Sequence, residues 1–405
     1  MIVLAGGDLV LPDRLLTNAS IVIEADRIAA IETRARIDSA AARVVEVQDC
    51  YVVPGFIDVH VHGVEGHDSL DSGDALAAIS SRLPRYGVTA FCPTTVACSP
   101  DDLRAVLVQV AKARVEPQGP GARVLPAHLE SNFINPDYRG AQPPECLRLP
   151  LSGGTSGRAK TSGSEPGGSY SGADILEVIA AARADVGIVT LAPELPGGME
   201  LVRVLVAAGH RVSLGHSGAT LDMAMSAIDA GARHATHLFN GMAPMHHRTP
   251  GVAAAVLSSD AVAAELICDG YHVHPAIGRL AIKSKGIDRV MAITDGTAGS
   301  GLPIGTTTRL GTLRIHVVEH AAVLDDGTLA GSTLTMNRAF ETIVSRFGFS
   351  VVEAARLCST TPARELGLTG LGVLAADAYA DITVMDRSFR VVRTFVAGRE
   401  VYGRS

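Results

Sequence analysis

The chain has 405 residues, of which 47% are hydrophobic, 19% are charged and none is tryptophan, a composition typical of a globular enzyme and not of a disordered or fibrous chain. The formal net charge of −7 gives no reason to expect nucleic acid or a membrane surface as a partner. The first residues lack a signal-like pattern, no run of about 18 apolar residues occurs, and the six cysteines form no CxxC pair, so we expect a cytoplasmic protein without a membrane span, a zinc knuckle or a disulfide framework.

Both ends of the chain carry short stretches in which apolar and polar residues alternate. The pattern runs through residues 20–31 and recurs in residues 380–386, 389–396 and 398–402. Alternation with period two predicts strands with one buried face, and such strands need a partner sheet. We therefore expect residues 1–53 and 374–405 to form one small β-sandwich domain.

Between these ends, from residue 54 to 373, apolar strand-like runs alternate with helical stretches rich in Ala and Leu. Helices are predicted at 75–85, 101–113, 175–184 and 199–208. Repeated β-then-α units predict an α/β fold, and roughly 320 residues suit the eight units of a (β/α)8 TIM-like barrel. An open doubly wound sheet is the alternative, but no strand–GxGxxG–helix unit supports it. The Gly- and Ser-rich segment 152–171 has no apolar period, and we interpret it as a linker, with a lid as the alternative.

Polar side chains that can bind a metal follow the apolar runs. They are His60, His62, Glu130, His216, His237 and Asp295. In a barrel the carboxyl ends of the strands meet at one rim, so residues distant in sequence can form a single site there. An isolated histidine is more often structural, but the whole set at strand ends favours a metal site. The His-x-His spacing places both imidazoles on one face of a strand, and imidazole with carboxylate suits Zn²⁺ or Fe²⁺.

Nine short motifs follow one another across nearly the whole chain. They are PGFIDVHVHG at 54–63, HLE at 128–130, TLAPE at 190–194, GHSGAT at 215–220, THLFNGM at 236–242, HHRTPG at 246–251, DGYH at 269–272, TDG at 294–296 and LAGSTLTM at 329–336. In this order they resemble the motifs of the N-acetylglucosamine-6-phosphate deacetylases of the amidohydrolase superfamily. Several are shared widely among amidohydrolases, whereas GHSGAT followed by THLFN and HHRxPG is more particular to the deacetylases.

The resemblance implies a metal-dependent amide hydrolase that converts N-acetylglucosamine 6-phosphate to glucosamine 6-phosphate and acetate, in amino sugar catabolism or cell-wall recycling. It implies that Glu130, His216 and His237 hold one divalent ion and that His60 and His62, with Glu130 bridging, hold a second. Asp295 would be the general base and acid; its alternative role is a helix N-cap. The chain has only four lysines and none ends a strand-like run, which argues against a carboxylated lysine as the bridging ligand.

The resemblance also implies substrate contacts and an assembly. Arg248 and His272 would bind the phosphate, and His128 or His272 would stabilise the oxyanion. The remaining contacts would come from Ala141, Asn240, Gly241, Leu329 and Gly331. Arg248 can instead be a surface or subunit-interface residue, and because such residues reach a neighbouring subunit's site in this family, we expect a homodimer.

One departure from the family concerns the residues after HLE. The family usually continues with Gly-Pro, whereas Ser131 and Asn132 follow here. These side chains either contact an altered substrate or close a turn. Two alternatives therefore stay open: a deacetylase for a related N-acyl amino sugar such as N-acetylgalactosamine 6-phosphate, and a catalytically silent barrel that acts as a binding or scaffold protein.

Overall fold

The centre of the protein is a barrel of parallel strands that the chain visits in sequence order. The computed structural model describes residues 1–33, 42–116, 119–150 and 172–404, so the predicted linker or lid at 152–171 lies outside the described residues. The barrel strands are β6 (Phe56–Val61), β9 (Val88–Thr95), β11 (Ala127–Glu130), β12 (Val186–Leu191), β13 (Arg211–Leu214), β14 (His234–Ala235), β15 (Ala263–Ile267) and β16 (Val290–Ile293), with the short β10 (Arg123–Val124) also on β9. A parallel bridge between Val61 and Gly296 brings the chain after β16 back to β6, so the sheet is nearly closed.

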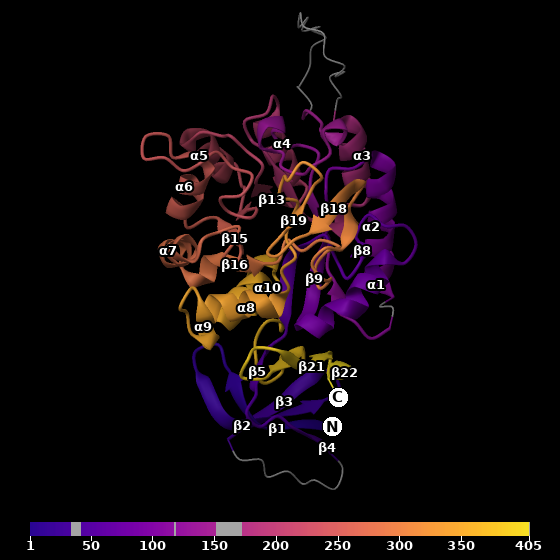
Figure 1. Ribbon diagram of the computed structural model, residues 1–405, viewed down its shortest axis with the longest axis vertical. Coiled ribbons are helices and arrows are strands. Elements are labelled where there is room, and N and C mark those ends of the chain that lie inside the picture. Colours follow the sequence, from indigo (N-terminus) through magenta and orange to yellow (C-terminus); the bar gives the residue numbers. More distant parts are fainter. Residues whose placement is uncertain (34–41, 117–118, 151–171, 405) are drawn as a thin grey trace, which may run out of the picture.

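Helices surround the barrel (Figure 1). They are α1 (Ala75–Arg82), α2 (Pro100–Val115), α3 (Ala173–Ala181), α4 (Gly198–Ala207), α5 (Leu221–Asp229), α6 (Gly251–Ser258), α7 (Pro275–Lys285), α8 (Met336–Ser345), α9 (Val351–Ala355) and α10 (Thr361–Leu366). In α2, for example, Ser99 caps the helix by accepting the Asp102 N–H at 3.1 Å, and Pro100 occupies the first turn. The four helices predicted from the sequence are confirmed within a few residues of their bounds, and no described helix is long and apolar enough to span a bilayer.

Strands from both chain ends form a second sheet, below the barrel in Figure 1. Its strands are β1 (Ile2–Val10), β2 (Leu15–Glu24), β3 (Arg27–Glu32), β4 (Arg43–Glu46), β5 (Tyr51–Pro54), β20 (Ile382–Met385), β21 (Val391–Val396) and β22 (Arg399–Gly403). The pairing of β5 with β20 joins the N-terminal and C-terminal strands. One edge of β1 pairs with β4 at its start and with β5 at its end, and Gly6, whose φ is 81°, lies where the sheet divides. The predicted fold class, a TIM-like barrel with a small β domain made by both chain ends, is confirmed.

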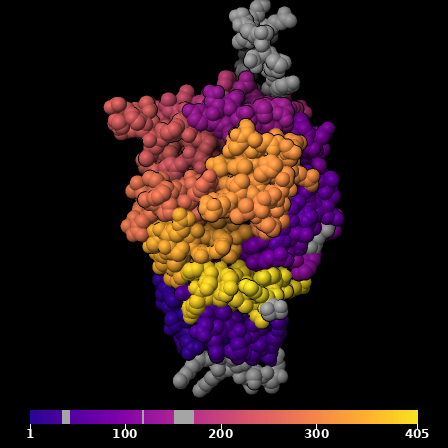
Figure 2. Space-filling model, viewed as in Figure 1, coloured from indigo at the N-terminus to yellow at the C-terminus, as the bar shows by residue number. Residues whose placement is uncertain are grey.

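A small antiparallel sheet follows β16 and lies outside the sequence prediction. It contains β17 (Thr307–Leu310), β18 (Leu313–Val317) and β19 (Ala322–Val323), and it is part of the orange surface in Figure 2. Its Leu310, Ile315 and Ala322 pack on Val96, which follows β9, and on Ala141. A second hairpin consists of β7 (Gly63–Val64) and β8 (His67–Asp68). Its Asp68 carboxylate accepts the N–H of Gly311, in the turn between β17 and β18, at 3.1 Å. The β17–β19 sheet is thus fixed on the rim formed by the ends of the barrel strands.

Candidate metal centre

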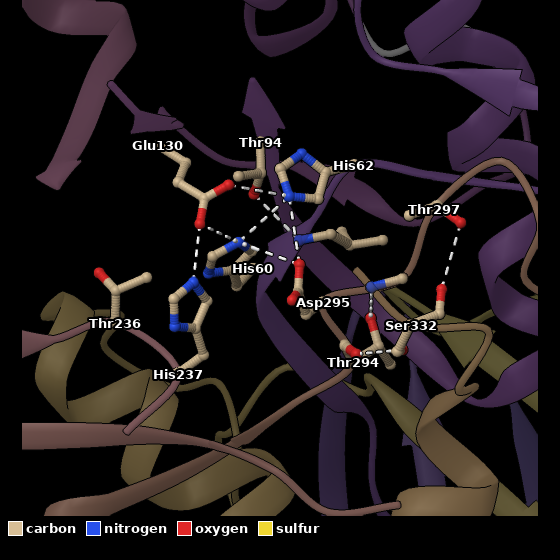
Figure 3. Close-up of polar contacts among 12 residues, drawn as sticks. His60, His62, Thr94, Glu130, Thr236, His237, Thr294, Asp295, Thr297 and Ser332 are labelled. Carbon is tan, nitrogen blue, oxygen red and sulfur yellow. Dashed lines mark hydrogen bonds and ion pairs between the residues drawn. The ribbon is translucent and has the colours of Figure 1, made fainter. Parts of the chain in front are cut away.

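The polar residues that the sequence singled out meet at the carboxyl rim of the barrel. His60 is the next-to-last residue of β6 and His62 directly follows that strand. Glu130 is the last residue of β11, and His216, His237 and Asp295 each follow a strand by two residues. All six are buried. Figure 3 shows His60, His62, Glu130, His237 and Asp295 pointing toward one another. Parallel strands therefore bring together groups that span 236 positions of the sequence, from His60 to Asp295.

One half of this cluster consists of Glu130, His216 and His237. Glu130 Oε1 lies 2.6 Å from His216 Nε2 and 2.8 Å from His237 Nε2, and the two imidazole nitrogens are 3.1 Å apart. The three groups form a set whose ligand atoms are close enough to share one ion.

The other half consists of His60, His62 and Asp295. His60 Nε2 and His62 Nε2 are 3.3 Å apart, and Asp295 Oδ1 lies 3.4 Å and 3.2 Å from them. Glu130 belongs to both halves, because its second oxygen, Oε2, lies 3.4 Å from His62 Nε2. One carboxylate therefore spans two groups of imidazoles.

The hydrogen bonds of the ring nitrogens show that these groups fit a cation. His216 Nδ1 donates to the Tyr138 carbonyl at 2.7 Å and His237 Nδ1 donates to the Asn240 carbonyl at 3.1 Å. A neutral imidazole that carries its proton on Nδ1 presents a lone pair at Nε2. Both Nε2 lone pairs then face each other and the Glu130 carboxylate. These electron-rich groups repel one another unless a divalent cation lies between them.

The pKa values agree with a site made for positive charge. Burial raises the pKa of Glu130, but His216, His237 and His62 outweigh burial and hold that pKa well below its usual value. Burial lowers the pKa of His62, but the Asp295 and Glu130 carboxylates outweigh it and raise the pKa to about 10. The two carboxylates thus stabilise positive charge at His62.

The backbone at three of the strand ends lies in the left-handed region. The φ angles are 47° at His216, 28° at His237 and 49° at Asp295. Residues other than glycine adopt such angles rarely, and they cluster where a chain must aim a functional side chain. Here the unusual φ turns each side chain from its strand end into the common cluster.

Comparison with known proteins assigns the fold to a family. The model of the Amidohydrolase family matches residues 51–401 of the chain. The chain belongs to the amidohydrolase family. It is 34% identical to N-acetylgalactosamine-6-phosphate deacetylase of Escherichia coli O157:H7 (90% of this chain and 91% of the relative) and 32% identical to N-acetylglucosamine-6-phosphate deacetylase of Bacillus subtilis strain 168 (96% and 94%). A mutant N-acetyl-D-glucosamine-6-phosphate deacetylase of Mycobacterium smegmatis, solved in complex with N-acetyl-D-glucosamine-6-phosphate, superposes with a TM-score of 0.86 at 32% identity over 99% of each chain.

Of the other residues predicted to contact substrate in this amidohydrolase, several lie beside the ligands. The Asn240 carbonyl holds His237, and a Cβ at Gly241 would lie 2.9 Å from His216 Nδ1, so glycine is needed there. Ala141 and Ala330, the latter between Leu329 and Gly331, pack in one cluster under the β17–β19 sheet.

The remaining residues predicted to contact substrate differ in whether their polar groups already have partners among the described residues. His272 Nδ1 donates to Asp269 Oδ2 at 2.6 Å, and no described residue hydrogen-bonds to its Nε2. Both nitrogens of His128 are engaged, with the Val59 carbonyl at 2.9 Å and with Thr190 Oγ1 at 2.8 Å. Arg248 stands on an exposed loop and forms no ion pair with the described residues.

Ser131 and Asn132 bond to the backbone of this amidohydrolase. Ser131 Oγ donates to the Thr190 carbonyl and accepts the Phe133 N–H at 3.1 Å. Asn132 Nδ2 lies 2.7 Å from the carbonyl oxygens of both Cys98 and Cys146. These contacts support the turn interpretation, because the two side chains close the loop after β11.

Two residues of the site were missed from the sequence. The Gln142 side chain accepts the Ala97 N–H at 2.7 Å and donates to Glu130 Oε2, and Glu265 Oε2 lies 2.9 Å from His60 Nδ1. A signal existed only for Glu265, which is a single acidic residue inside the apolar strand 263–267. Gln142 lies in a loop without a pattern, and only the fold brings it to Glu130.

Proposed function

We propose that this amidohydrolase is a metal-dependent deacetylase that hydrolyses N-acetylglucosamine 6-phosphate to glucosamine 6-phosphate and acetate, in amino sugar catabolism or cell-wall recycling. The observation that carries the proposal is the Glu130 carboxylate, which spans two groups of buried imidazoles next to Asp295. Relatives that carry the name of this deacetylase, and the likeness to a structure holding that sugar phosphate, support the choice of substrate.

The ligand set that we propose divides into two positions. Glu130, His216 and His237 would hold one divalent ion, and His60 and His62, bridged by Glu130, would hold a second. Zn²⁺ and Fe²⁺ suit these donors best, because no cysteine takes part and imidazole with carboxylate matches borderline divalent ions. An ion there supplies Lewis-acid chemistry: it polarises a carbonyl oxygen and makes water nucleophilic near neutral pH.

Asp295 is the proposed group that moves the proton. Burial raises its pKa, but His60 and His62 outweigh burial and lower the pKa below the ordinary value, so the carboxylate is ready to accept a proton at Oδ1. It would take that proton from the attacking water and deliver it to the amide nitrogen as the amine leaves. His272, whose Nε2 is free, is the better candidate for substrate contact, and His128, whose nitrogens are both engaged, is the better candidate for a structural role.

Substrate recognition involves the residues around this centre. Arg248 and His272 would bind the phosphate, and Asn240, Gly241, Ala141, Leu329 and Gly331 would contact the rest of the substrate. Because Arg248 lies on an exposed loop, it is suited to reach the site of a second subunit, which supports the proposal of a homodimer. The cytoplasmic location stays a prediction from the sequence.

A second candidate substrate is N-acetylgalactosamine 6-phosphate. The observation that favours it is the relative of that specificity, which is 34% identical to this chain over 90% of its length. A silent barrel is disfavoured, because all six ligand and proton-transfer candidates are present and converge.

The test is acetate release from the metal-supplemented protein. N-acetylglucosamine 6-phosphate, its galactosamine epimer and unphosphorylated N-acetylglucosamine are compared side by side, with Asp295→Asn as the variant. We expect preferential turnover of the glucosamine phosphate and a loss of about 10²–10⁴-fold in kcat for the variant, because it can no longer accept the proton. Preference for the epimer would support the second candidate. No turnover of any of these amides by metal-loaded protein would contradict the deacetylase proposal.

A further inference from the structure

We propose that Glu265 is the positioning residue of the metal centre, and that it holds His60 in its ligand form while it fixes the loop that carries His237. The proposal builds on the proposed metal-dependent function, but it concerns a residue outside the ligand set. Glu265 lies in the middle of β15 and its side chain is fully buried.

The first contact orients His60. Glu265 Oε2 lies 2.9 Å from His60 Nδ1. When Glu265 is ionised, its carboxylate can only accept, so Nδ1 carries the proton. The Nε2 lone pair then faces His62 and Asp295, which is the orientation that a metal ligand needs. A neighbouring carboxylate also makes the imidazole a stronger ligand.

The second contact concerns the other half of the centre. The Leu238 N–H, next to the proposed ligand His237, donates to the Glu265 backbone carbonyl at 2.8 Å. Glu265 therefore contacts a ligand of one half with its side chain, and contacts the loop that carries a ligand of the other half with its backbone carbonyl.

The kind of acceptor distinguishes His60 from the other ligands. His216 and His237 donate their Nδ1 protons to neutral backbone carbonyls, whereas His60 donates to a carboxylate. A buried carboxylate costs more free energy than a carbonyl, and its second oxygen, Oε1, has no hydrogen-bond partner among the described residues. An acceptor that only held the His60 ring in place would not need the negative charge of Glu265. A cation bound at His60 Nε2 would stabilise that charge through the imidazole ring.

The experiment compares metal binding by Glu265→Gln, which keeps the size and removes the charge, with Glu365→Gln. Glu365 is a matched control because its carboxylate pairs with Arg289 beside α10 and contacts no ligand. Metal content is measured by mass spectrometry after dialysis against graded chelator. We expect Glu265→Gln to lose affinity for metal by about 10- to 100-fold, with the control unchanged. Equal metal content and affinity in Glu265→Gln and wild type would overturn the proposal.

Two further measurements separate positioning from general stability. In a His60→Gln background, Glu265→Gln should change metal affinity far less than it does in the wild type, since the two residues act through one contact. Additive losses would contradict the proposal. If Glu265→Gln does not fold, Glu265→Asp keeps the charge but shortens the reach to Nδ1, and the same loss is expected. Metal content is read without substrate, so failure of the deacetylase assay and failure of this proposal are distinguishable.

Discussion

At the scale of single residues, the barrel interior holds histidines of two kinds. Three proposed ligands, His60, His216 and His237, have a hydrogen-bond acceptor at Nδ1, whereas the proposed ligand His62 and the non-ligand His234, in β14, have no partner for Nδ1 among the described residues. Burial, with Arg211 and His128 nearby, lowers the pKa of His234 to about 3. The proposed ligands serve the metal site, whereas His234, which is not a ligand, makes the fold sensitive to acid.

The acid sensitivity has a defined sign. Because the pKa of His234 is lower in the folded chain than the value of about 6.5 expected in the unfolded chain, the unfolded state binds the proton more tightly. The contribution of neutral His234 is therefore complete above pH 6.5 and is lost as the pH falls toward 3. We expect His234→Leu to reduce the loss of unfolding free energy between pH 7 and pH 4.5 by on the order of 2 kcal/mol.

Urea unfolding of metal-free protein at the two pH values measures this difference, with His320→Leu as the exposed control. A loss that is as large in His234→Leu as in the wild type would show that another group causes the acid sensitivity.

The site could be predicted from the sequence as far as its members follow strands. His60, His62, Glu130 and Asp295 each end or follow an apolar run, and the barrel places such positions on one rim. Glu265 and Gln142 could not be predicted, because their contacts depend on which strand neighbours which and on how a loop folds back. The interpretation of His128 as an oxyanion group depended on a nitrogen that the fold engages elsewhere.

At the scale of elements, the β17–β19 sheet is held to the barrel rim by few polar contacts. Asp68 is buried and accepts the N–H groups of Leu70 at 2.9 Å and Gly311 at 3.1 Å, and Arg309 pairs with Asp71 at 2.6 Å. The sequence did not predict this sheet, because its strands are short and two of them lack the clean alternation of a half-buried strand. Helices α1 to α4 were predicted because they lie in stretches rich in Ala and Leu, whereas α5 to α10 were not predicted individually.

Removal of the Asp68 carboxylate should loosen the β17–β19 sheet. In Asp68→Ala the Gly311 N–H loses its acceptor, which costs about 1–3 kcal/mol locally. We expect amide hydrogen exchange in residues 307–317 to accelerate about tenfold or more, as mass spectrometry of peptides can measure. Asp325→Ala, which removes an exposed ion pair with Arg314 on the same sheet, is the control and should have little effect. Unchanged exchange in Asp68→Ala would mean that apolar packing alone holds the sheet.

At the scale of the whole molecule, the barrel and the sheet made by the chain ends are joined by polar contacts. Arg123 makes a bidentate pair with Asp381 at 2.8 Å and 3.0 Å, and the Asp381 side chain is only 2% exposed. Thr383 and Thr394 donate to the carbonyls of Gly87 and Pro84, each at 2.7 Å. We propose that residues 1–53 and 374–405 act as one unit beside the barrel of residues 54–373, with these contacts across the boundary.

Asp381→Ala should destabilise the molecule measurably. The change leaves Arg123 and the Ala397 N–H without their acceptor, and because Arg123 is about a third exposed, we expect a loss of roughly 2–3 kcal/mol in the free energy of unfolding. Thermal unfolding followed by circular dichroism measures the loss. Asp13→Ala, which removes an exposed pair with Arg14, is the matched control. Equal melting temperatures for the two variants would argue that the junction contributes nothing.

The left-handed backbone at His216, His237 and Asp295 sets the stability of the chain against its capacity to bind a metal. Each such residue holds conformational energy on the order of 1 kcal/mol or more, which glycine at the same position would release. A glycine substitution that relieved this strain would therefore remove a proposed metal ligand or the proposed proton acceptor, so a more stable barrel would be a weaker metal binder or a weaker catalyst.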